Sequence, residues 1–150
     1  MRILFVIENY IPHIGGVEVV FRNLCEGLVK KGHSVDIVTH RMKGAKKFEV
    51  INGVRVHRVD CFHSRYAFSF FSIPKAMELA KNADIIHTTS FNGAPPAWLV
   101  SRIFGKPCII TVHEVWVGLW DKLTEKNPFS SFMHDFLERL IYSLTFNKYV

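Results

Sequence analysis

The sequence predicts an α/β protein with a Rossmann-like, doubly wound parallel sheet and helices on both faces. Short apolar runs recur along the chain as candidate strands, and the segments between them carry apolar residues at helical spacing. Glycine and proline mark most of the boundaries between these segments. With 150 residues, 49% of them hydrophobic, the chain fits one globular domain, which we expect to span residues 1–150.

The first forty residues predict a strand–helix–strand unit. Residues 3–7 are continuously apolar, which is typical of a strand buried on both faces of a parallel sheet. A loop over residues 8–16 precedes a helix with apolar residues at helical spacing over 17–28. Gly32 suits the end of that helix, and residues 35–39 form the next strand.

A β-hairpin should follow, because residues 48–51 and 54–59 flank Asn52-Gly53, a strong turn signal. Residues 60–71 are rich in aromatic side chains and are predicted to be irregular. The later elements keep the alternation, with strands expected at 84–88 and 108–112 and helices at 74–80, 97–104 and 132–144. A long loop is expected over residues 113–129, and residues 147–150 are interpreted as the start of a further strand.

Composition and charge exclude several classes of protein. No apolar run is long enough for a membrane-spanning helix, and the N-terminus lacks the apolar region of a signal peptide. Three widely spaced cysteines argue against a disulfide framework and for a reducing cytoplasm. Eight histidines show no metal-ligand spacing, so no metal site is expected. No nucleic-acid-binding motif is present, and we expect no nucleic-acid partner.

Two glycines in the first strand-to-helix loop are the first candidate binding residues. Gly15 and Gly16 lie where the backbone N–H groups of a helix N-terminus attract phosphate, although a simple turn would also explain them. Neither a G-x-G-x-x-G nor a phosphate-binding P-loop motif is present. Glu18 follows in the first helical turn, where it either favours the helix dipole or contacts a ligand.

Two histidines are further candidates because both are predicted at the carboxyl ends of core strands, where ligands bind in such sheets. His87 either lines the ligand site or is a hydrogen-bonded structural residue. His113 is followed by Glu114, which places a titratable ring beside a carboxylate at the same edge.

A basic and aromatic segment predicts contact with a membrane surface or an acceptor. Residues 41–58 carry six Lys and Arg against one Glu, and five aromatic residues follow closely. A solvated loop followed by core aromatics is the alternative interpretation. The candidate surface residues are Arg41, Lys43, Lys46, Lys47, Phe68, Phe70 and Phe71.

The order of these features resembles a known family. The segment MRILFVIENYIPHIGGVEVVFRNLCEGLVKKGHSVDIVT is similar to the opening of the family 4 glycosyltransferases, which are retaining enzymes with the two-domain GT-B fold. Further on, ADIIHTTS and PCIITVHEVW are similar to the ends of the family's fourth and fifth strands. The resemblance covers residues 1–146 in order.

The resemblance implies transfer of a sugar from a nucleotide-sugar donor to a glycan or lipid-linked acceptor, without a cofactor or a required metal. In cell-envelope polysaccharide, lipopolysaccharide or glycoconjugate biosynthesis, such a protein would be cytoplasmic and peripheral at the inner face of the membrane. By this resemblance Gly15 and Gly16 approach the donor diphosphate and His113 contacts the transferred sugar. Glu114 stands where the family commonly has Asp.

The same resemblance implies that this chain is the acceptor-side half of a longer enzyme. The C-terminal domain, which binds most of the donor, has no counterpart here, so the chain alone is expected to be inactive. The alternative function is a non-catalytic, Rossmann-like module that binds a nucleotide or a glycan.

Overall fold

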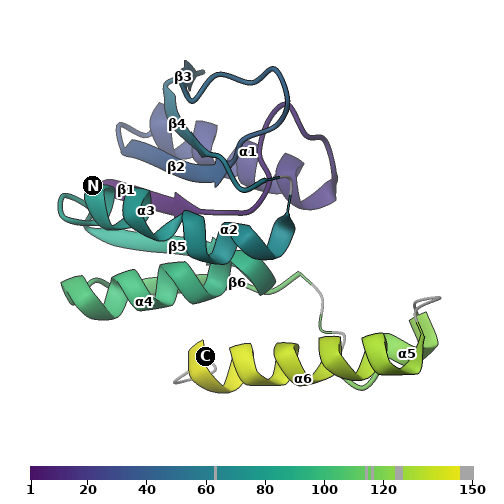
Figure 1. The fold of residues 1–150 in the computed structure, drawn as a ribbon. Helices are drawn as coiled ribbons and strands as arrows, with labels where there is room; N and C mark the ends of the chain where they lie inside the picture. Colours follow the sequence, from purple (N-terminus) through teal and green to yellow (C-terminus); the bar gives the residue numbers. More distant parts are fainter. Residues whose placement is uncertain (63, 114, 116, 124–126, 146–150) are drawn as a thin grey trace. The chain divides into compact units, whose positions relative to one another are not determined.

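The computed structural model describes residues 1–62, 64–113, 115, 117–123 and 127–145 (Figure 1). The chain forms two compact units, Met1–Thr111 and Val112–Val150. The first unit contains the sheet, and the second contains two helices.

One six-stranded sheet organises the first unit. Its strands are β1 (Arg2–Val6), β2 (Ser34–His40), β3 (Phe48–Ile51), β4 (Val54–Val59), β5 (Ile85–Thr89) and β6 (Cys108–Thr111). They lie in the order β3-β4-β2-β1-β5-β6, and every neighbouring pair is parallel except β3 with β4. The predicted sheet is therefore confirmed, with one antiparallel hairpin strand at its edge.

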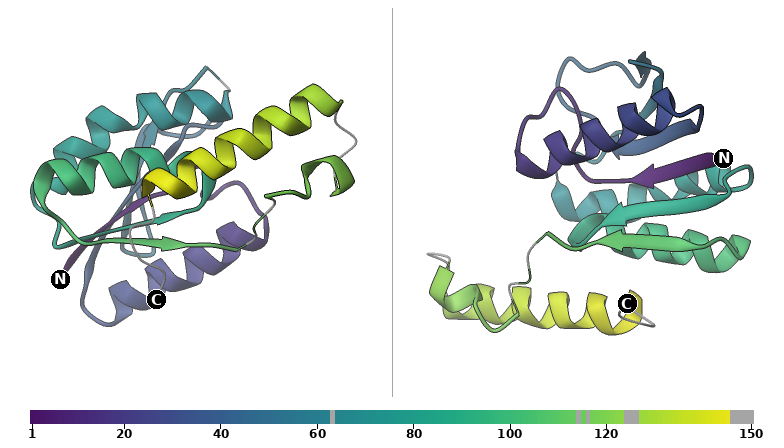
Figure 2. Two further views of the ribbon diagram at one scale, coloured as in Figure 1. Left: turned by 90° about the horizontal axis from the view of Figure 1, so that it is seen from below. Right: turned by 180° about the vertical axis from the view of Figure 1, so that it is seen from behind.

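Helices cover both faces of this sheet, as predicted. The helical elements of the first unit are α1 (Gly16–Lys30), α2 (Arg65–Phe71), α3 (Ile73–Ala80), the short 3₁₀ helix η1 (Phe91–Gly93) and α4 (Ala94–Phe104). The two views of Figure 2 show α1 on one face, with α3 and α4 on the other. This three-layer arrangement is the doubly wound form.

The central strand β1 is buried on both faces, which explains why its sequence is continuously apolar. Leu4 and Val6 belong to a core cluster with residues of α2, α3 and α4. Phe5 and Ile7 belong to a second cluster, which includes Phe21 of α1. Both faces of β1 are therefore buried, and alternation with polar residues would place polar groups in one of the cores.

Local turn chemistry also follows the sequence. Asn52 and Gly53 both have positive φ, 49° and 84°, as a two-residue hairpin turn requires. Gly105 ends α4 in the left-handed region with a φ of 62°. The three cysteines are free, with Cys25 and Cys61 buried.

The segment expected to be irregular contains a helix. Residues 65–71 form α2, and the Ser64 hydroxyl accepts a hydrogen bond of 3.3 Å from the Ala67 backbone N–H. Ser64 is thus the N-cap that marks the start of this helix, in a position that suits Ser. The prediction of an irregular 60–71 segment was wrong for this part.

The second unit contains α5 (Trp120–Leu123) and α6 (Pro128–Thr145). The Trp120 indole N–H donates to the Glu138 carboxylate at 2.7 Å, and its ring centroid lies 4.8 Å from that of His134. The loop expected over residues 113–129 therefore includes a short helix held against α6. The strand expected at 147–150 lies outside the described residues.

Candidate functional site

The topology defines where a ligand should bind in the first unit. The connection from β1 to β2 passes through α1 on one face, whereas the connection from β4 to β5 passes through α2 and α3 on the other. The direction of winding therefore reverses between β1 and β5. In open parallel sheets ligands bind beyond the carboxyl ends of the strands at this point.

The N-terminus of α1 lies at this edge, immediately after the loop from β1. Gly15 is the N-cap residue, and no side-chain hydrogen bond caps the helix. A Cβ added to Gly16 would meet no atom within 4 Å, so the fold itself does not need a glycine there. This leaves open space at a helix N-terminus, the arrangement that a phosphate group can approach.

The Glu18 carboxylate lies against the loop at Gly15, a contact that the sequence does not indicate. A Cβ added to Gly15 would collide with this carboxylate, and its Oε1 is 3.3 Å from Nδ1 of His13. The negative charge thus already favours the helix dipole. A phosphate at Gly16 would have to tolerate this carboxylate or displace it.

A buried arginine holds the loop that leads to Gly15. The Arg58 side chain is only 1% exposed and pairs with the Glu49 carboxylate at 2.5 Å. Its guanidinium donates to the backbone oxygens of Ile11, at 2.5 Å, and Lys46, at 3.2 Å. One side chain from β4 therefore fixes the β1–α1 loop and the β2–β3 loop together, which the sequence analysis did not foresee.

Another pair that sequence reasoning missed lies between the two sides of the switch point. Glu8, just after β1, accepts a 2.7 Å hydrogen bond from the side-chain amide of Asn92 in η1. Glu8 is 9% exposed, and its backbone oxygen also accepts from the Thr39 hydroxyl at 2.9 Å. The two side chains are 84 residues apart in sequence, so no local pattern could have linked them.

The turn that carries Asn92 is closely packed. Phe91 has a φ of 67°, a conformation that is costly for a residue with a Cβ. A Cβ on Gly93 would lie 2.7 Å from the Val6 backbone oxygen and 2.6 Å from Oγ1 of Thr88. The Ser69 hydroxyl of α2 donates to the Asn92 backbone oxygen at 2.9 Å. Asn92 is therefore placed by contacts with β1, β5 and α2.

His87 occupies the middle of β5 rather than the end of the strand. Its ring stacks on Phe5 at 4.9 Å and meets Phe21 edge-on at 5.5 Å. Its Nε2 lies 2.8 Å from the Thr111 hydroxyl, and burial lowers its pKa to about 4. The prediction that His87 lies at a strand end was wrong, because β5 continues to Thr89 and the ring turns toward α1. The geometry fits the structural alternative.

The structure describes His113 but not its predicted neighbour in the site, Glu114. His113 follows the last residue of β6 by two positions, is exposed, and belongs to the second unit. Its predicted proximity to Gly15 and Gly16 stays a prediction. Glu114 lies outside the described residues.

The predicted aromatic surface is real in part. Phe70 and Phe71 are 73% and 48% exposed, but Phe68 is fully buried in the core beneath α2, so its assignment to the surface was wrong. Phe62 and Tyr66, two of the five aromatic residues that follow the basic segment, are 80% and 56% exposed. We call the four exposed residues the aromatic surface, and the Phe62 and Phe71 rings within it meet edge-on at 5.4 Å.

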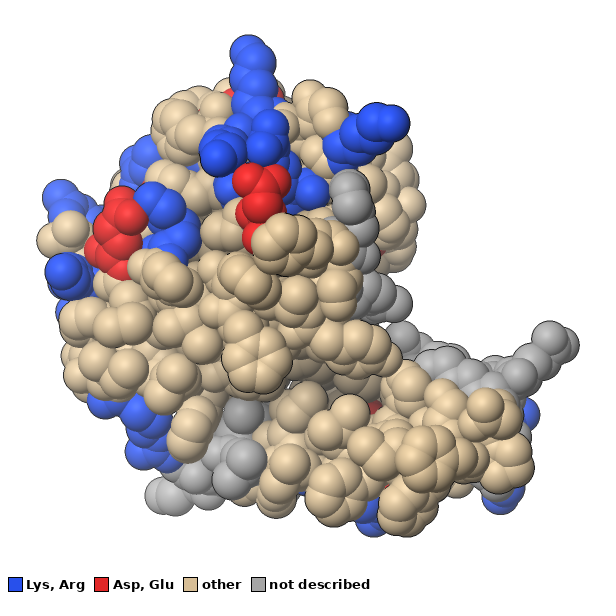
Figure 3. Space-filling model, in the orientation of Figure 1, with Lys and Arg blue, Asp and Glu red and all other residues tan. Residues whose placement is uncertain are grey.

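The basic charges near this surface are fewer than the sequence indicates. Arg55 pairs with Asp36 and Arg58 is buried, so neither adds to an exposed patch. Arg41 and Lys47 share Asp60, while Lys43 and Lys46 make no ion pair within the described chain. Figure 3 shows Lys and Arg side chains gathered over the end that carries β3 and β4, next to a wide area without charged side chains. We call Arg41, Lys43, Lys46 and Lys47 the basic surface; with the charge of Asp60 subtracted, its net charge is about +3.

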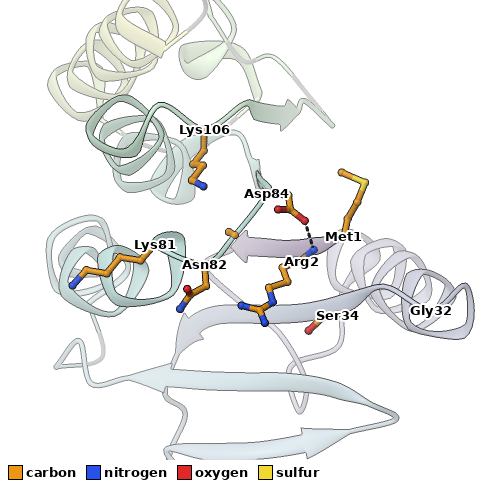
Figure 4. Close-up of a pocket in the computed structure, with 9 residues that line it drawn as sticks. Met1, Arg2, Gly32, Ser34, Lys81, Asn82, Asp84 and Lys106 are labelled. Atoms are coloured by element: carbon orange, nitrogen blue, oxygen red, sulfur yellow. Dashed lines mark hydrogen bonds between the residues drawn. The ribbon is translucent and has the colours of Figure 1, made fainter.

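A cavity of about 500 Å³ opens at the opposite, amino-terminal edge of the sheet (Figure 4). Arg2, Lys81 and Lys106 line it together with Asp84, whose carboxylate accepts from the Arg2 backbone N–H at 2.7 Å. The carboxyl ends of α1, α3 and α4 lie at this edge, and cations there complement the helix dipoles. The negative ends of these helix dipoles disfavour binding of an anion. The carboxyl ends of the strands therefore remain the better candidate site for a phosphate-containing ligand.

Two kinds of feature are missing from the described residues. None of their helices combines the length and the apolar character needed to cross a bilayer. No group of three or more His, Cys, Asp or Glu among them is arranged to hold a metal ion.

A doubly wound sheet with a glycine-flanked helix N-terminus at its switch point defines a Rossmann-like, ligand-binding class of protein. Comparison with known sequences then gives the family. The sequence pattern of Glycosyltransferase Family 4 matches residues 14–147, and the chain belongs to this family.

Two curated relatives agree with this assignment. An alpha-monoglucosyldiacylglycerol synthase of Streptococcus pneumoniae is 37% identical over 120 residues, which is 75% of this chain and 26% of the synthase. An uncharacterized glycosyltransferase of Methanocaldococcus jannaschii is 32% identical over 131 residues, which is 79% of this chain and 32% of that protein. The chain thus spans about a quarter to a third of the length of these relatives.

Solved structures share the fold. Sucrose-phosphate synthase from Thermosynechococcus elongatus aligns with a TM-score of 0.66 at 20% identity, over 93% of this chain and 39% of that one. The catalytic domain of starch synthase IV from Arabidopsis thaliana aligns with a TM-score of 0.61 at 17% identity, over 75% of this chain and 34% of that one. At these identities the likeness concerns the fold alone, and it confirms the Rossmann-like architecture expected from the sequence.

Proposed function

We propose that the chain is the acceptor-side domain of a retaining glycosyltransferase that moves a sugar from a nucleotide-sugar donor to a lipid-linked or glycan acceptor. The observation that carries the proposal is the open N-terminus of α1 at the switch point. Gly16 leaves room there for a donor phosphate, and the helix end favours negative charge. Membership of Glycosyltransferase Family 4 supports this use of the site.

The donor site of this domain is incomplete in physical terms. Departure of a nucleoside diphosphate needs stabilisation of the developing negative charge. The loop that precedes α1, residues 8–15, contains no Lys or Arg, and Glu18 in the first turn of α1 adds a negative charge. We therefore expect a second domain of a longer chain to supply cations to the donor, and we expect the 150-residue chain alone to have no measurable turnover.

Activity assays test this half-enzyme proposal. UDP-, GDP- and ADP-sugars should give no transfer with the 150-residue chain but transfer with a longer parent chain. In that parent chain, Gly16→Val should lower kcat/KM sharply, because the side chain fills the space open to phosphate. Robust transfer by the 150-residue chain, abolished by His113→Ala, would contradict the proposal.

The acceptor side is proposed to contact the cytoplasmic surface of a membrane. The aromatic surface exposes four large rings, and the adjoining basic surface carries a net charge of about +3. Each Lys or Arg near an anionic bilayer contributes about 1 kcal/mol, and the rings add an interfacial contact. The name of the streptococcal relative, a synthase of a glucosylated diacylglycerol, agrees with a lipid acceptor.

Vesicle co-sedimentation tests this membrane contact. Binding should be stronger to vesicles with phosphatidylserine than to pure phosphatidylcholine, and should weaken as salt is raised. The double variant Lys43→Glu/Lys46→Glu should abolish the preference, whereas Lys30→Glu/Lys31→Glu, at the opposite edge of the sheet, should keep most of it. Equal binding to neutral and anionic vesicles would refute the electrostatic contact.

A further inference from the structure

The Glu8–Asn92 pair offers a negative charge and a hydrogen-bond acceptor, whereas the N-terminus of α1 offers hydrogen-bond donors and favours an anion. The Asn92 amide nitrogen donates to the Glu8 carboxylate at 2.7 Å, so the donor end of this amide is already used. Its carbonyl Oδ1 therefore faces away from Glu8 as a hydrogen-bond acceptor. Asn92 is half-buried, and Glu8 lies beneath it at 9% exposure.

We propose that Asn92 binds a hydroxyl group of the acceptor, with Glu8 as the residue that orients its amide. This inference rests on the proposed function and names the class of acceptor. A hydroxyl can donate its proton to Oδ1 of Asn92, whereas a phosphodiester anion or a phosphate dianion has no proton to donate. The Glu8 carboxylate directly behind the amide also repels a phosphate. The group that Asn92 binds is thus an uncharged hydroxyl.

The position of Asn92 in the fold supports recognition rather than chance exposure. Gly93 packs closely against Val6 and Thr88, which restrains η1, and Phe91 at its start has a left-handed backbone conformation. A recognition group held by packing in this way loses little entropy when a ligand binds.

The same turn is joined to the proposed membrane surface. Ser69 of α2 donates to the Asn92 backbone oxygen at 2.9 Å, and the next residue along α2 is the exposed Phe70. An amphiphile whose chains lie at the aromatic surface would therefore present its polar end toward Asn92. The N-terminus of α1, which lies at the same end of the sheet, favours phosphate, so this end offers separate places for the donor and the acceptor.

Matched lipids test the inference on the chain itself. Vesicles of phosphatidylcholine and phosphatidylserine are doped with dioleoylglycerol, with its acetate ester in which the hydroxyl is capped, or with dioleoyl phosphatidic acid. Wild-type protein should bind the dioleoylglycerol vesicles about five-fold more tightly than the ester vesicles, the factor expected for one net hydrogen bond. Phosphatidic acid should give only the increase expected from its added charge.

The variants identify the residues responsible. Asn92→Ala should remove the preference for dioleoylglycerol over its ester. Glu8→Gln should keep most of it, because the carbonyl oxygen of the glutamine side chain would still accept from the amide, while Glu8→Ala should reduce it. Asn82→Ala, an exposed asparagine at the opposite edge, is the matched control and should behave as wild type. Circular dichroism and thermal unfolding confirm that each variant is folded.

The outcomes separate this inference from the proposed function. Binding to phosphatidylserine vesicles without any preference for the free hydroxyl, or a preference that survives in Asn92→Ala, overturns the hydroxyl site and leaves the membrane contact standing. Absence of binding to every vesicle overturns both.

Discussion

The close packing of η1 against β1 predicts that Gly93→Ala destabilises the protein. The added Cβ would lie 2.7 Å from the Val6 backbone oxygen and 2.6 Å from Oγ1 of Thr88, and a backbone atom cannot rotate away as a flexible side chain can. Over-packing of this kind costs about 1–3 kcal/mol. For a chain of this size, that loss corresponds to a decrease in Tm of roughly 2–12 °C.

Urea unfolding followed by circular dichroism measures the effect. Gly16→Ala is the matched control, because its Cβ would meet nothing within 4 Å and its φ is not positive. The control should leave the free energy of unfolding unchanged or raise it by less than about 1 kcal/mol. An unchanged midpoint for Gly93→Ala, or an equal loss for Gly16→Ala, would refute the reasoning. A change in the m value would show that the unfolding reaction itself has changed.

Three further predictions concern named side chains. Arg58→Ala should lower the free energy of unfolding by about 3 kcal/mol in urea, because it removes a buried guanidinium and leaves the half-buried Glu49 carboxylate and two backbone carbonyl oxygens without that partner. Arg22→Ala, in an exposed pair, should change it little. His87→Phe should flatten the pH profile of stability measured between pH 6.5 and 4: the folded-state pKa of about 4 lies below the ordinary 6.5, so wild-type stability is lost as pH falls through this window. Ser64→Ala should cost about 1 kcal/mol and reduce the helical circular dichroism signal, by removing the cap of α2; an unaltered signal and midpoint would argue against that cap.

Much of the fold could be predicted because its signals are local. The continuous apolar run of β1 requires a strand with two covered faces, and Asn52-Gly53 requires a tight turn between two strands. The prediction for the α2 segment was wrong for a local reason as well. Its aromatic residues occur on several sides of a short helix, so no apolar period stands out, although Ser64 was a visible N-cap signal.

The sequence could predict only the part of the candidate site that a single loop forms. The glycines at the start of α1 are adjacent in sequence, and the strand before them fixes their edge of the sheet. The Glu8–Asn92 pair and the Arg58 contacts join segments that the sequence separates by tens of residues. They depend on which strands become neighbours, and that order is a property of the whole fold. Likewise, a run such as F-S-F-F does not reveal that Phe68 turns inward and Phe70 outward.

The two carbonyl contacts of Arg58 have a practical consequence for protein engineering. The contact with the Lys46 backbone oxygen fixes the β2–β3 loop, and the Arg41 guanidinium, which donates to the Ala45 backbone oxygen at 2.9 Å, closes the same loop from its start. Gly44 lies between Arg41 and these two anchored residues, at an exposed tip, with a φ of 79° and open space within 4 Å of where a Cβ would stand. An epitope or a single-cysteine label inserted there would lengthen only the tip, since the anchors hold the strands on either side. The chain thus offers a handle within its basic surface that leaves the sheet and the α1 loop intact.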